Sequence, residues 1–303
     1  MAIKSLIPKD QRYLGNPLLK RSGVKHNYTR EEVEEYRKCK RSVKYFTEKH
    51  FKIVHVDKGL ITYKPRNYQR KMLRMIHKNR FNIIMACRQS GKTTSMTAYL
   101  LWYILFNSDK IVGILANKGA TAREILGRIQ LAYQHLPGFL QQGVEDFNKG
   151  YIHLENGSKV YAESTASDSI RGYSFSFIYI DECAHIPKHV WDEFYNSVYP
   201  TITSGKETKM VLVSTPKGLN HFYKFWVDSK EKRNSFKNFS VIWDDVPGRD
   251  KKWKEETIAN TSEAQFAQEQ SCLDYNTLVT VKDKESQEIY TLPIGELYEW
   301  LNY

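Results

Sequence analysis

The chain has 303 residues, of which 26% are charged and 41% hydrophobic, and this composition is typical of a soluble globular protein with a substantial core. Its net charge of +12 favours an anionic partner, most simply nucleic acid, although a basic solvated face is the alternative. The four cysteines lack zinc-site or disulfide spacing, and no apolar run reaches membrane-spanning length. The sequence therefore predicts that the protein is located in a reducing cytoplasm.

Helical and extended patterns alternate along most of the chain. A capping box, Thr29-Arg-Glu-Glu32, opens the first predicted helix after a basic, irregular N-terminus. The predicted elements are this helix to about residue 48, a hairpin over 51–63, a helix from Asn67, the strand 83–85, the helix 92–106, the strand 110–116, the helix 119–135, a hairpin across Asn156-Gly157, the strand 177–180, the helix 188–199 and the strand 209–214. This alternation predicts an α/β fold with a mainly parallel sheet flanked by helices.

A phosphate-binding loop is predicted where the apolar strand 83–85 is followed by Ala86-Cys-Arg-Gln-Ser-Gly-Lys-Thr-Thr94. In this Walker A pattern, backbone N–H groups point at the phosphates, Lys92 reaches the β- and γ-phosphates, and the Thr93 hydroxyl binds Mg²⁺. Ala86 stands where the common pattern has its first glycine. The predicted ATP-binding residues are Tyr68, Gln69, Arg88, Gln89, Ser90, Gly91, Lys92, Thr93 and Thr94.

A second motif, Asp181-Glu182, follows the apolar strand 177–180, as in Walker B. Open parallel sheets bind ligands at the carboxyl ends of their strands, which is where both motifs lie. Asp181 is the predicted Mg²⁺ carboxylate and Glu182 the carboxylate that polarises the attacking water. Taken alone, the first motif could be an ordinary helix start and the second a solvated strand end. The two motifs together, in this order, predict an ATPase.

Three further sites have less specific signals. Arg88 is either an arginine finger that neutralises transition-state charge or a surface charge. Ser214-Thr215-Pro216 lies at the end of the strand 209–214 and is either a sensor of the γ-phosphate or an ordinary turn. Tyr68-Gln69 is either an adenine clamp or an exposed helix start.

These motifs together resemble the large terminase subunit of T-even-like tailed phages, the ATPase that packages viral DNA. The resemblance covers residues from about 30 to 271. It is carried by Tyr68-Gln-Arg70, Cys87-Arg-Gln-Ser-Gly-Lys-Thr-Thr94, Ser169-Ile-Arg-Gly172, Tyr179-Ile-Asp-Glu-Cys-Ala184, Ser214-Thr-Pro216 and the stretch Trp243 to Gln270.

The resemblance implies specific roles. Gln69 and Tyr68 would contact adenine; Arg88 would be a finger supplied in cis; and 214–216 would be the coupling motif. An ATPase core over about 60–230 would carry a small subdomain built from 1–60 and 230–271. Its partners would be double-stranded DNA, the portal protein and the small terminase subunit. It would form a ring on the portal at the prohead, in the host cytoplasm. A helicase-like ATPase and a protein that only binds nucleotide are the alternatives.

The character of the sequence changes after Ser271. Residues 272–303 carry two Lys and six Asp or Glu, a net charge of −4, so residues 1–271 carry +16. Family members continue into a nuclease, which nothing after Gln270 resembles, so this chain is not expected to cut DNA by itself. The segment from Cys272 instead resembles the N-terminal, β-rich fragment of an intein, whose thiol would attack the Ser271 carbonyl.

No histidine follows His221, so the residues that complete splicing would come from elsewhere. The sequence therefore predicts half of a split intein, with Cys272 as the splicing nucleophile and a separate intein-nuclease fragment as partner. A truncated contiguous intein and a buried core cysteine are the other interpretations.

Overall fold

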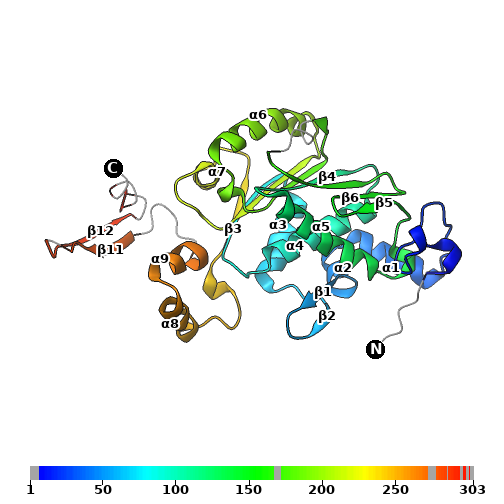
Figure 1. The fold of residues 1–303 in the computed structure, drawn as a ribbon, viewed down its shortest axis with the longest axis horizontal. Coiled ribbons are helices and arrows are strands. Elements are labelled where there is room, and N and C mark those ends of the chain that lie inside the picture. Colours follow the sequence, from blue (N-terminus) through cyan, green and yellow to red (C-terminus); the bar gives the residue numbers. More distant parts are fainter. Residues whose placement is uncertain are drawn as a thin grey trace.

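The computed structural model describes residues 7–166, 172–271, 278–284, 286–293, 296, 297 and 300. An eight-stranded sheet in the order β10-β3-β9-β8-β4-β7-β6-β5 runs through the molecule (Figure 1). The neighbouring strands from β10 to β7 are parallel, whereas β6 and β5 are antiparallel. The strands are β3 (Phe81–Ala86), β4 (Ile111–Ala116), β5 (Val144–Asn148), β6 (Tyr151–Leu154), β7 (Lys159–Ser164), β8 (Phe177–Ile180), β9 (Lys209–Ser214) and β10 (Lys237–Val241).

Helices cover both faces of this sheet: α6 and α7 lie on one side and α3, α4 and α5 on the other (Figure 1). The helices are α1 (Arg30–Arg41), α2 (Val43–Lys49), α3 (Asn67–Lys78), α4 (Lys92–Phe106), α5 (Gly119–Gln134), α6 (Lys188–Ser204), α7 (His221–Lys230), α8 (Lys251–Asn260) and α9 (Glu263–Phe266). None of the helices in the described part of the chain is both long and apolar enough to cross a membrane.

The central strands are buried because both of their faces are covered. Every residue of β3 and β8 is buried, and helix α4 is buried from Ser95 to Phe106 between the sheet and its neighbouring helices. Apolar strands of this kind are typical of parallel sheets with helices on both faces. The predicted α/β fold with a mainly parallel sheet is confirmed.

The N-terminal elements differ from the prediction in one respect. Glu32 N donates to Thr29 Oγ1 and Thr29 N donates to Glu32 Oε2, which confirms the capping box. The single helix predicted to about residue 48 is wrong, because α1 ends at Arg41 and Ser42 caps a second helix by accepting a hydrogen bond from Tyr45 N. The predicted hairpin is present as β1 (Lys52–His55) and β2 (Gly59–Thr62).

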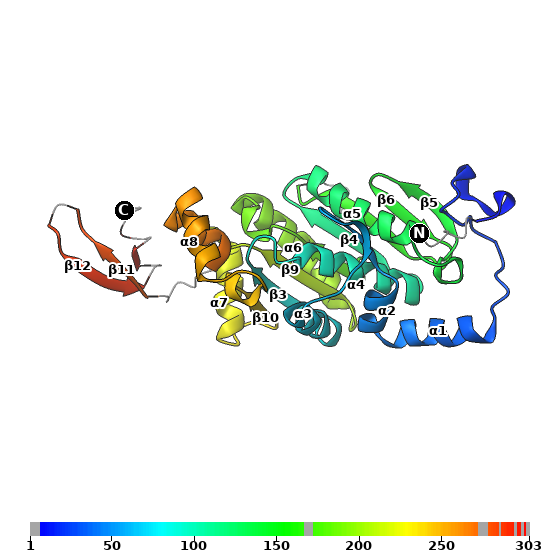
Figure 2. The same cartoon turned by 90° about the horizontal axis from the view of Figure 1, so that it is seen from below.

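Two strands of the large sheet, β5 and β10, were missed by the sequence patterns. Both are short, carry polar residues and include exposed positions, because they form the two edges of the sheet. The prediction placed 230–271 in a small subdomain, but β10 pairs with β3 and so belongs to the sheet. At the opposite edge, Val144 N donates to Lys20 O, and Figure 2 shows the N-terminal residues beside β5.

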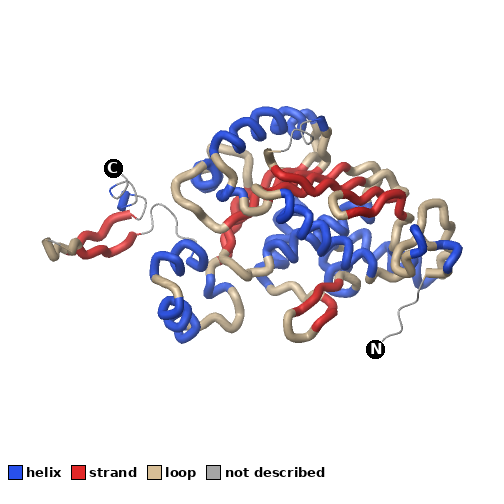
Figure 3. The backbone as a smooth tube through the Cα atoms, viewed as in Figure 1, coloured by secondary structure: helices blue, strands red, loops and turns tan. Residues whose placement is uncertain are grey.

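The C-terminal segment forms a separate hairpin of β11 (Leu278–Lys282) and β12 (Ile289–Pro293). Figure 3 shows this hairpin projecting from the side of the molecule that carries α8 and α9. The strand predicted for the intein-like segment is described only from Leu278 onward. Cys272 lies outside the described residues, as does most of the motif Ser169 to Gly172.

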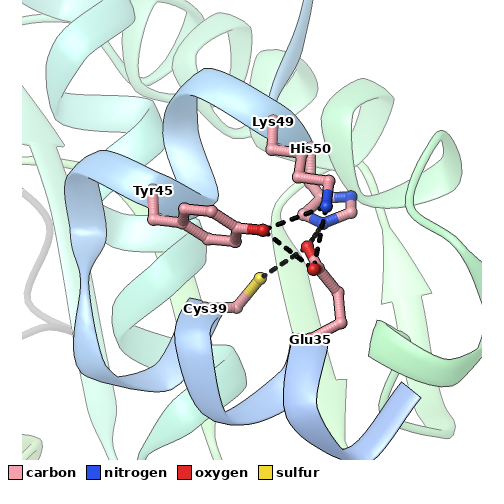
Figure 4. Close-up of polar contacts among 5 residues, drawn as sticks. All are labelled: Glu35, Cys39, Tyr45, Lys49 and His50. Atoms are coloured by element: carbon pink, nitrogen blue, oxygen red, sulfur yellow. Dashed lines mark hydrogen bonds and ion pairs between the residues drawn. The ribbon is translucent and has the colours of Figure 1, made fainter. Parts of the chain in front are cut away.

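The Glu35 carboxylate is the centre of a polar cluster that joins α1 to α2 (Figure 4). Its Oε2 accepts hydrogen bonds from the Tyr45 hydroxyl and the Lys49 ammonium, each at 2.8 Å. Its Oε1 lies 2.7 Å from His50 Nε2 and 3.8 Å from Cys39 Sγ. One donor atom each from Glu35, Cys39 and His50 lie within 4.8 Å of one another, a spacing that could hold a metal ion. The ammonium already balances the carboxylate charge, so we interpret the cluster as a structural link.

We expect Glu35→Gln to lower the free energy of unfolding by about 1–2 kcal/mol, because the partly buried donors lose their ionised acceptor. Burial raises the pKa of Glu35, but hydrogen bonds from Lys49, His50 and Tyr45 outweigh it and lower the pKa from 4.5 to about 2. Its contribution is therefore complete above pH 4.5 and is lost as the pH falls toward 2. Denaturant unfolding at several pH values, with exposed Glu34→Gln as control, measures this difference; a constant difference would contradict the assignment.

Candidate functional site

The candidate site lies at the carboxyl ends of three neighbouring strands, in the order β3-β9-β8. Strand β3 leads into the predicted phosphate loop, β8 leads into Asp181, and β9, which ends at Ser214, lies between them. Because these strands are parallel, their carboxyl ends meet at one edge of the sheet, where ligands bind in open α/β folds. Residues that are far apart in sequence therefore converge.

The loop consists of Arg88, Gln89, Ser90 and Gly91, and α4 begins with Lys92, Thr93 and Thr94. Gly91 has φ +73°, and a Cβ there would lie 2.5 Å from Gln69 Nε2, so the position requires glycine. Ala86 is the last residue of β3 and continues the strand, which explains why this position does not need a glycine. Lys92 Nζ donates to Ala86 O at 2.9 Å and so lies over its own loop.

The two Walker motifs are in direct contact. Thr93 Oγ1 donates to Asp181 Oδ2 at 3.1 Å, and Glu182 N donates to Asp181 Oδ1 at 3.1 Å. Burial raises the pKa of Asp181, and the nearby Lys92 ammonium partly opposes this shift. A hydroxyl and a carboxylate side by side are the oxygen ligands that Mg²⁺ prefers, so the donor set fits the predicted ion.

Glu182 is exposed and has φ +51°, a left-handed conformation that is uncommon outside glycine. Such backbone strain is often found at functional sites, where the surrounding structure maintains it. Asp181 is buried whereas Glu182 is exposed, so the two adjacent carboxylates differ in environment. That difference matches the distinct roles predicted for them.

The predicted adenine residues lie against the loop. The Tyr68 hydroxyl and Gln69 Nε2 both donate to Ser90 O, at 2.7 and 2.8 Å. Gln69 is buried, and its Oε1 accepts a hydrogen bond from Arg66 N. Both residues therefore support the loop in this structure, and a contact with adenine stays a prediction.

The predicted coupling motif contacts the Walker B turn. Buried Ser214 accepts a hydrogen bond from Ala184 N at 3.1 Å, and Thr215 and Pro216 follow it at the end of β9. Because of this hydrogen bond, a displacement of the Walker B turn would also displace the end of β9.

Two residues that the sequence analysis missed hold the same turn. Asn220 Nδ2 donates to Ala184 O at 2.7 Å, and His221 Nε2 lies 2.8 Å from Cys183 O, which can only accept. The His221 ring also stacks on Trp191 of α6, with ring centroids 4.5 Å apart. Asn220 caps α7, and this capping pattern was the one signal in the sequence that could have drawn attention to it.

The segment 243–271, which we call the clasp segment, contacts the phosphate loop at Arg88. Arg88 Nε pairs with Glu269 Oε2 at 2.5 Å, and Arg88 N donates to Glu269 O at 2.9 Å. Arg249 donates through Nη2 to Arg88 O and through Nη1 to Gln270 Oε1, both at 2.9 Å. No pattern in the sequence indicated these contacts.

Aromatic packing gives the clasp segment a small core of its own. The Trp243 and Trp253 rings are stacked with their centroids 6.3 Å apart, and Phe266 packs against both rings. The Arg249 guanidinium lies 4.6 Å from the centroid of the Trp253 ring, which orients it toward the loop.

Comparison with known proteins agrees with this geometry. The large terminase subunits of Thermus phage G20c and Thermus virus P23-45 are each 28% identical to the chain over 187 residues, which are 55% of this chain and 37% of theirs. The region that matches this chain is thus well under half of the length of these relatives.

Solved structures show the same fold. The ATPase domain of the Thermus phage P74-26 large terminase is 26% identical, with a TM-score of 0.56 over 69% of this chain and 93% of that domain. The HK97 bacteriophage large terminase is 14% identical, with a TM-score of 0.66 over 80% of this chain and 56% of that one, and it supports the fold alone.

A family model described as "Terminase large subunit, T4likevirus-type, N-terminal" matches residues 83–286. The match begins in β3, contains both Walker motifs and the coupling motif, and continues past Cys272. The match covers more than half of the chain. The chain therefore belongs to the family of T4-like phage large terminase subunits and corresponds to the N-terminal part of such a subunit.

Proposed function

We propose that this chain is the ATP-hydrolysing part of a phage large terminase and that it drives double-stranded DNA into the prohead. The observation that carries the proposal is the hydrogen bond between Thr93 and Asp181, which joins the Walker A and Walker B motifs at one edge of the sheet. Solved large terminases from a thermophilic bacteriophage, with the same fold, are complexes with ATP-gamma-S and with ADP. The site geometry and these complexes support ATP as the nucleotide here.

Each residue has a distinct task in the proposed reaction. The loop amides and Lys92 bind the phosphates, and Glu182 accepts a proton from the attacking water. Thr93 and Asp181 would hold Mg²⁺, which would neutralise phosphate charge when bound. Arg88 would stabilise the charge that develops in the transition state.

The position of β9 suggests how hydrolysis is coupled to motion. Ser214 is bonded to the Walker B turn, and the same turn is bonded to Asn220 and His221 of the α7 region. A shift of the turn after loss of the γ-phosphate would therefore move α7 together with the end of β9. This linkage supports the coupling role of 214–216.

The proposed partners are double-stranded DNA, a portal protein and a small terminase subunit, with the chain in a ring on the prohead in the host cytoplasm. Displacement of a third strand from triplex DNA tests this directly, because a duplex motor removes that strand without separating the duplex. We expect ATP-dependent displacement in the presence of portal and small subunit. Separation of the duplex strands would instead favour the helicase-like alternative.

We further propose that Cys272 is the nucleophile of a split intein, supported by the change of charge at this residue and by the hairpin of β11 and β12 that follows it. Its thiol would add to the Ser271 carbonyl carbon and displace the Cys272 nitrogen as an amine, which exchanges a peptide bond for a thioester. The family match that extends to residue 286 crosses this proposed boundary, so the boundary needs its own test.

With its cognate C-terminal fragment, the chain should lose residues 272–303 and become joined through Ser271 to the nuclease-bearing polypeptide. Cys272→Ala should prevent joining and leave ATP turnover unchanged, because the Walker motifs are not altered. Intact-mass spectrometry of the mixture measures both species. Persistence of the full-length mass beside an active cognate fragment would refute the split-intein proposal.

A further inference from the structure

Two basic residues lie next to each other at the amino ends of β3 and β9, the edge of the sheet opposite to the candidate site. Arg80 directly precedes β3, and Lys209 is the first residue of β9, the strand that pairs with β3. Met210 N donates to Arg80 O at 2.9 Å, so the two cations belong to neighbouring strand starts. Helix α3 ends just before Arg80, and α6 ends shortly before Lys209.

Each of these cations caps the helix that precedes the other. Lys209 donates through Nζ to three carbonyls at the end of α3, at 3.0, 3.0 and 2.8 Å, those of Ile76, His77 and Asn79. Arg80 donates through Nη2 to two carbonyls at the end of α6, those of Ile202 and Gly205, and through Nε to Thr208 O. The last carbonyls of a helix lack intrahelical partners and attract cations. We call this arrangement the reciprocal cap.

The two capped helices reach the candidate site at their other ends. At the start of α3, Tyr68 and Gln69 both bond Ser90 O of the phosphate loop. Helix α6 begins after the Walker B turn, and its Trp191 stacks on His221, which contacts that turn. The helices lie on opposite faces of the sheet (Figure 1), so the reciprocal cap joins the layer behind Walker A to the layer behind Walker B.

We propose that the reciprocal cap sets the spacing between the two Walker motifs, and that Lys209 is thereby a positioning residue for hydrolysis. The inference rests on the proposed function, because it assumes that the site hydrolyses ATP. The phosphate loop would place the γ-phosphate, and β9 with α6 would place the turn that carries Glu182. A misplacement of about 1 Å that originates far from the chemistry can lower a rate by as much as 10²-fold.

Steady-state turnover of ATP tests the role of Lys209. Lys209→Met removes the donors and should lower kcat roughly tenfold, whereas KM should change less than about twofold because the loop amides and Lys92 still bind the phosphates. Lys206→Met, an exposed position in the same connection between α6 and β9, is the matched control and should leave both quantities unchanged. Lys209→Arg should keep most of the turnover, since a guanidinium donates to the same carbonyls and a hollow of about 410 Å³ beside Lys209 leaves room for it.

A second comparison separates positioning from a general loss of stability. Glu35→Gln weakens the cluster between α1 and α2, and it should leave kcat near the wild-type value at a temperature well below unfolding. An equal loss of kcat in Glu35→Gln and Lys209→Met would make Lys209 a merely structural residue. That result, or wild-type kcat in Lys209→Met, would overturn the inference.

Amide hydrogen exchange without nucleotide tests the reciprocal cap itself. Lys209→Met should increase exchange in the last turn of α3, and Arg80→Met should increase it in the last turn of α6, although neither helix contains the substituted residue. Increased exchange confined to the strand that carries the substitution would contradict the reciprocal cap. This readout needs no hydrolysis, so a wild-type chain without ATP turnover would refute the proposed ATPase and leave the exchange test intact.

Discussion

Glu182→Gln should lower ATP turnover by about 10²–10⁴-fold, the usual contribution of a general base, and leave ATP affinity nearly unchanged. The buried Asp181, not Glu182, bonds the Thr93 hydroxyl, so the loop and the oxygen ligands for Mg²⁺ stay in place in this variant. Glu182 is exposed on a strained turn and acts mainly on the attacking water, whose proton transfer belongs to the transition state.

Lys92→Ala provides the contrast, because its ammonium binds ground-state phosphate charge and its loss should remove ATP binding itself. Equilibrium binding of a fluorescent ATP analogue and steady-state phosphate release measure the two effects separately, with Glu263→Gln as a neutral control. Wild-type turnover in Glu182→Gln would show that another group activates the water.

Arg88→Ala should lower turnover by roughly 10³–10⁵-fold if its guanidinium acts as an arginine finger. Nucleotide affinity should change much less, since the ground-state phosphates are held by the loop amides and Lys92. Arg88→Lys should recover only part of the rate, because an ammonium lacks the planar fork of donors.

The ratio of the losses in turnover and affinity decides the role of Arg88. Equal losses in both quantities would make it a ground-state phosphate ligand, and no loss would make it a surface charge that pairs with Glu269. The measurement requires turnover and Kd on the same preparation, with thermal unfolding to show that the variant is folded.

The sequence predicted those parts of the site that are encoded by local patterns. The loop 88–91 and Asp181 each follow an apolar strand, and the alternation of strands with helices placed both motifs at one edge of a parallel sheet. The contact between Thr93 and Asp181 follows from that arrangement. The central sheet and its flanking helices were predictable for the same reason.

Features that depend on tertiary contact were not predictable. Strand β10 has little apolar character because it is an edge strand, and only its pairing with β3 identifies it. The contacts of Arg249 and Glu269 with Arg88 join residues more than 150 positions apart, and a charged residue in a loop or a helix gives no signal of such a partner. The break at Ser42 likewise depends on a single side-chain cap within a continuous helical pattern.

Steady-state phosphate release from ATP by the purified chain, compared with Lys92→Ala, tests the central claim most directly. The account predicts Mg²⁺-dependent release by the wild-type chain and none above background by Lys92→Ala, because the phosphate loop and the Asp181 carboxylate form one site. Equal release by the two proteins, or none by a wild-type chain that is folded and supplied with Mg²⁺, DNA and portal, would contradict it.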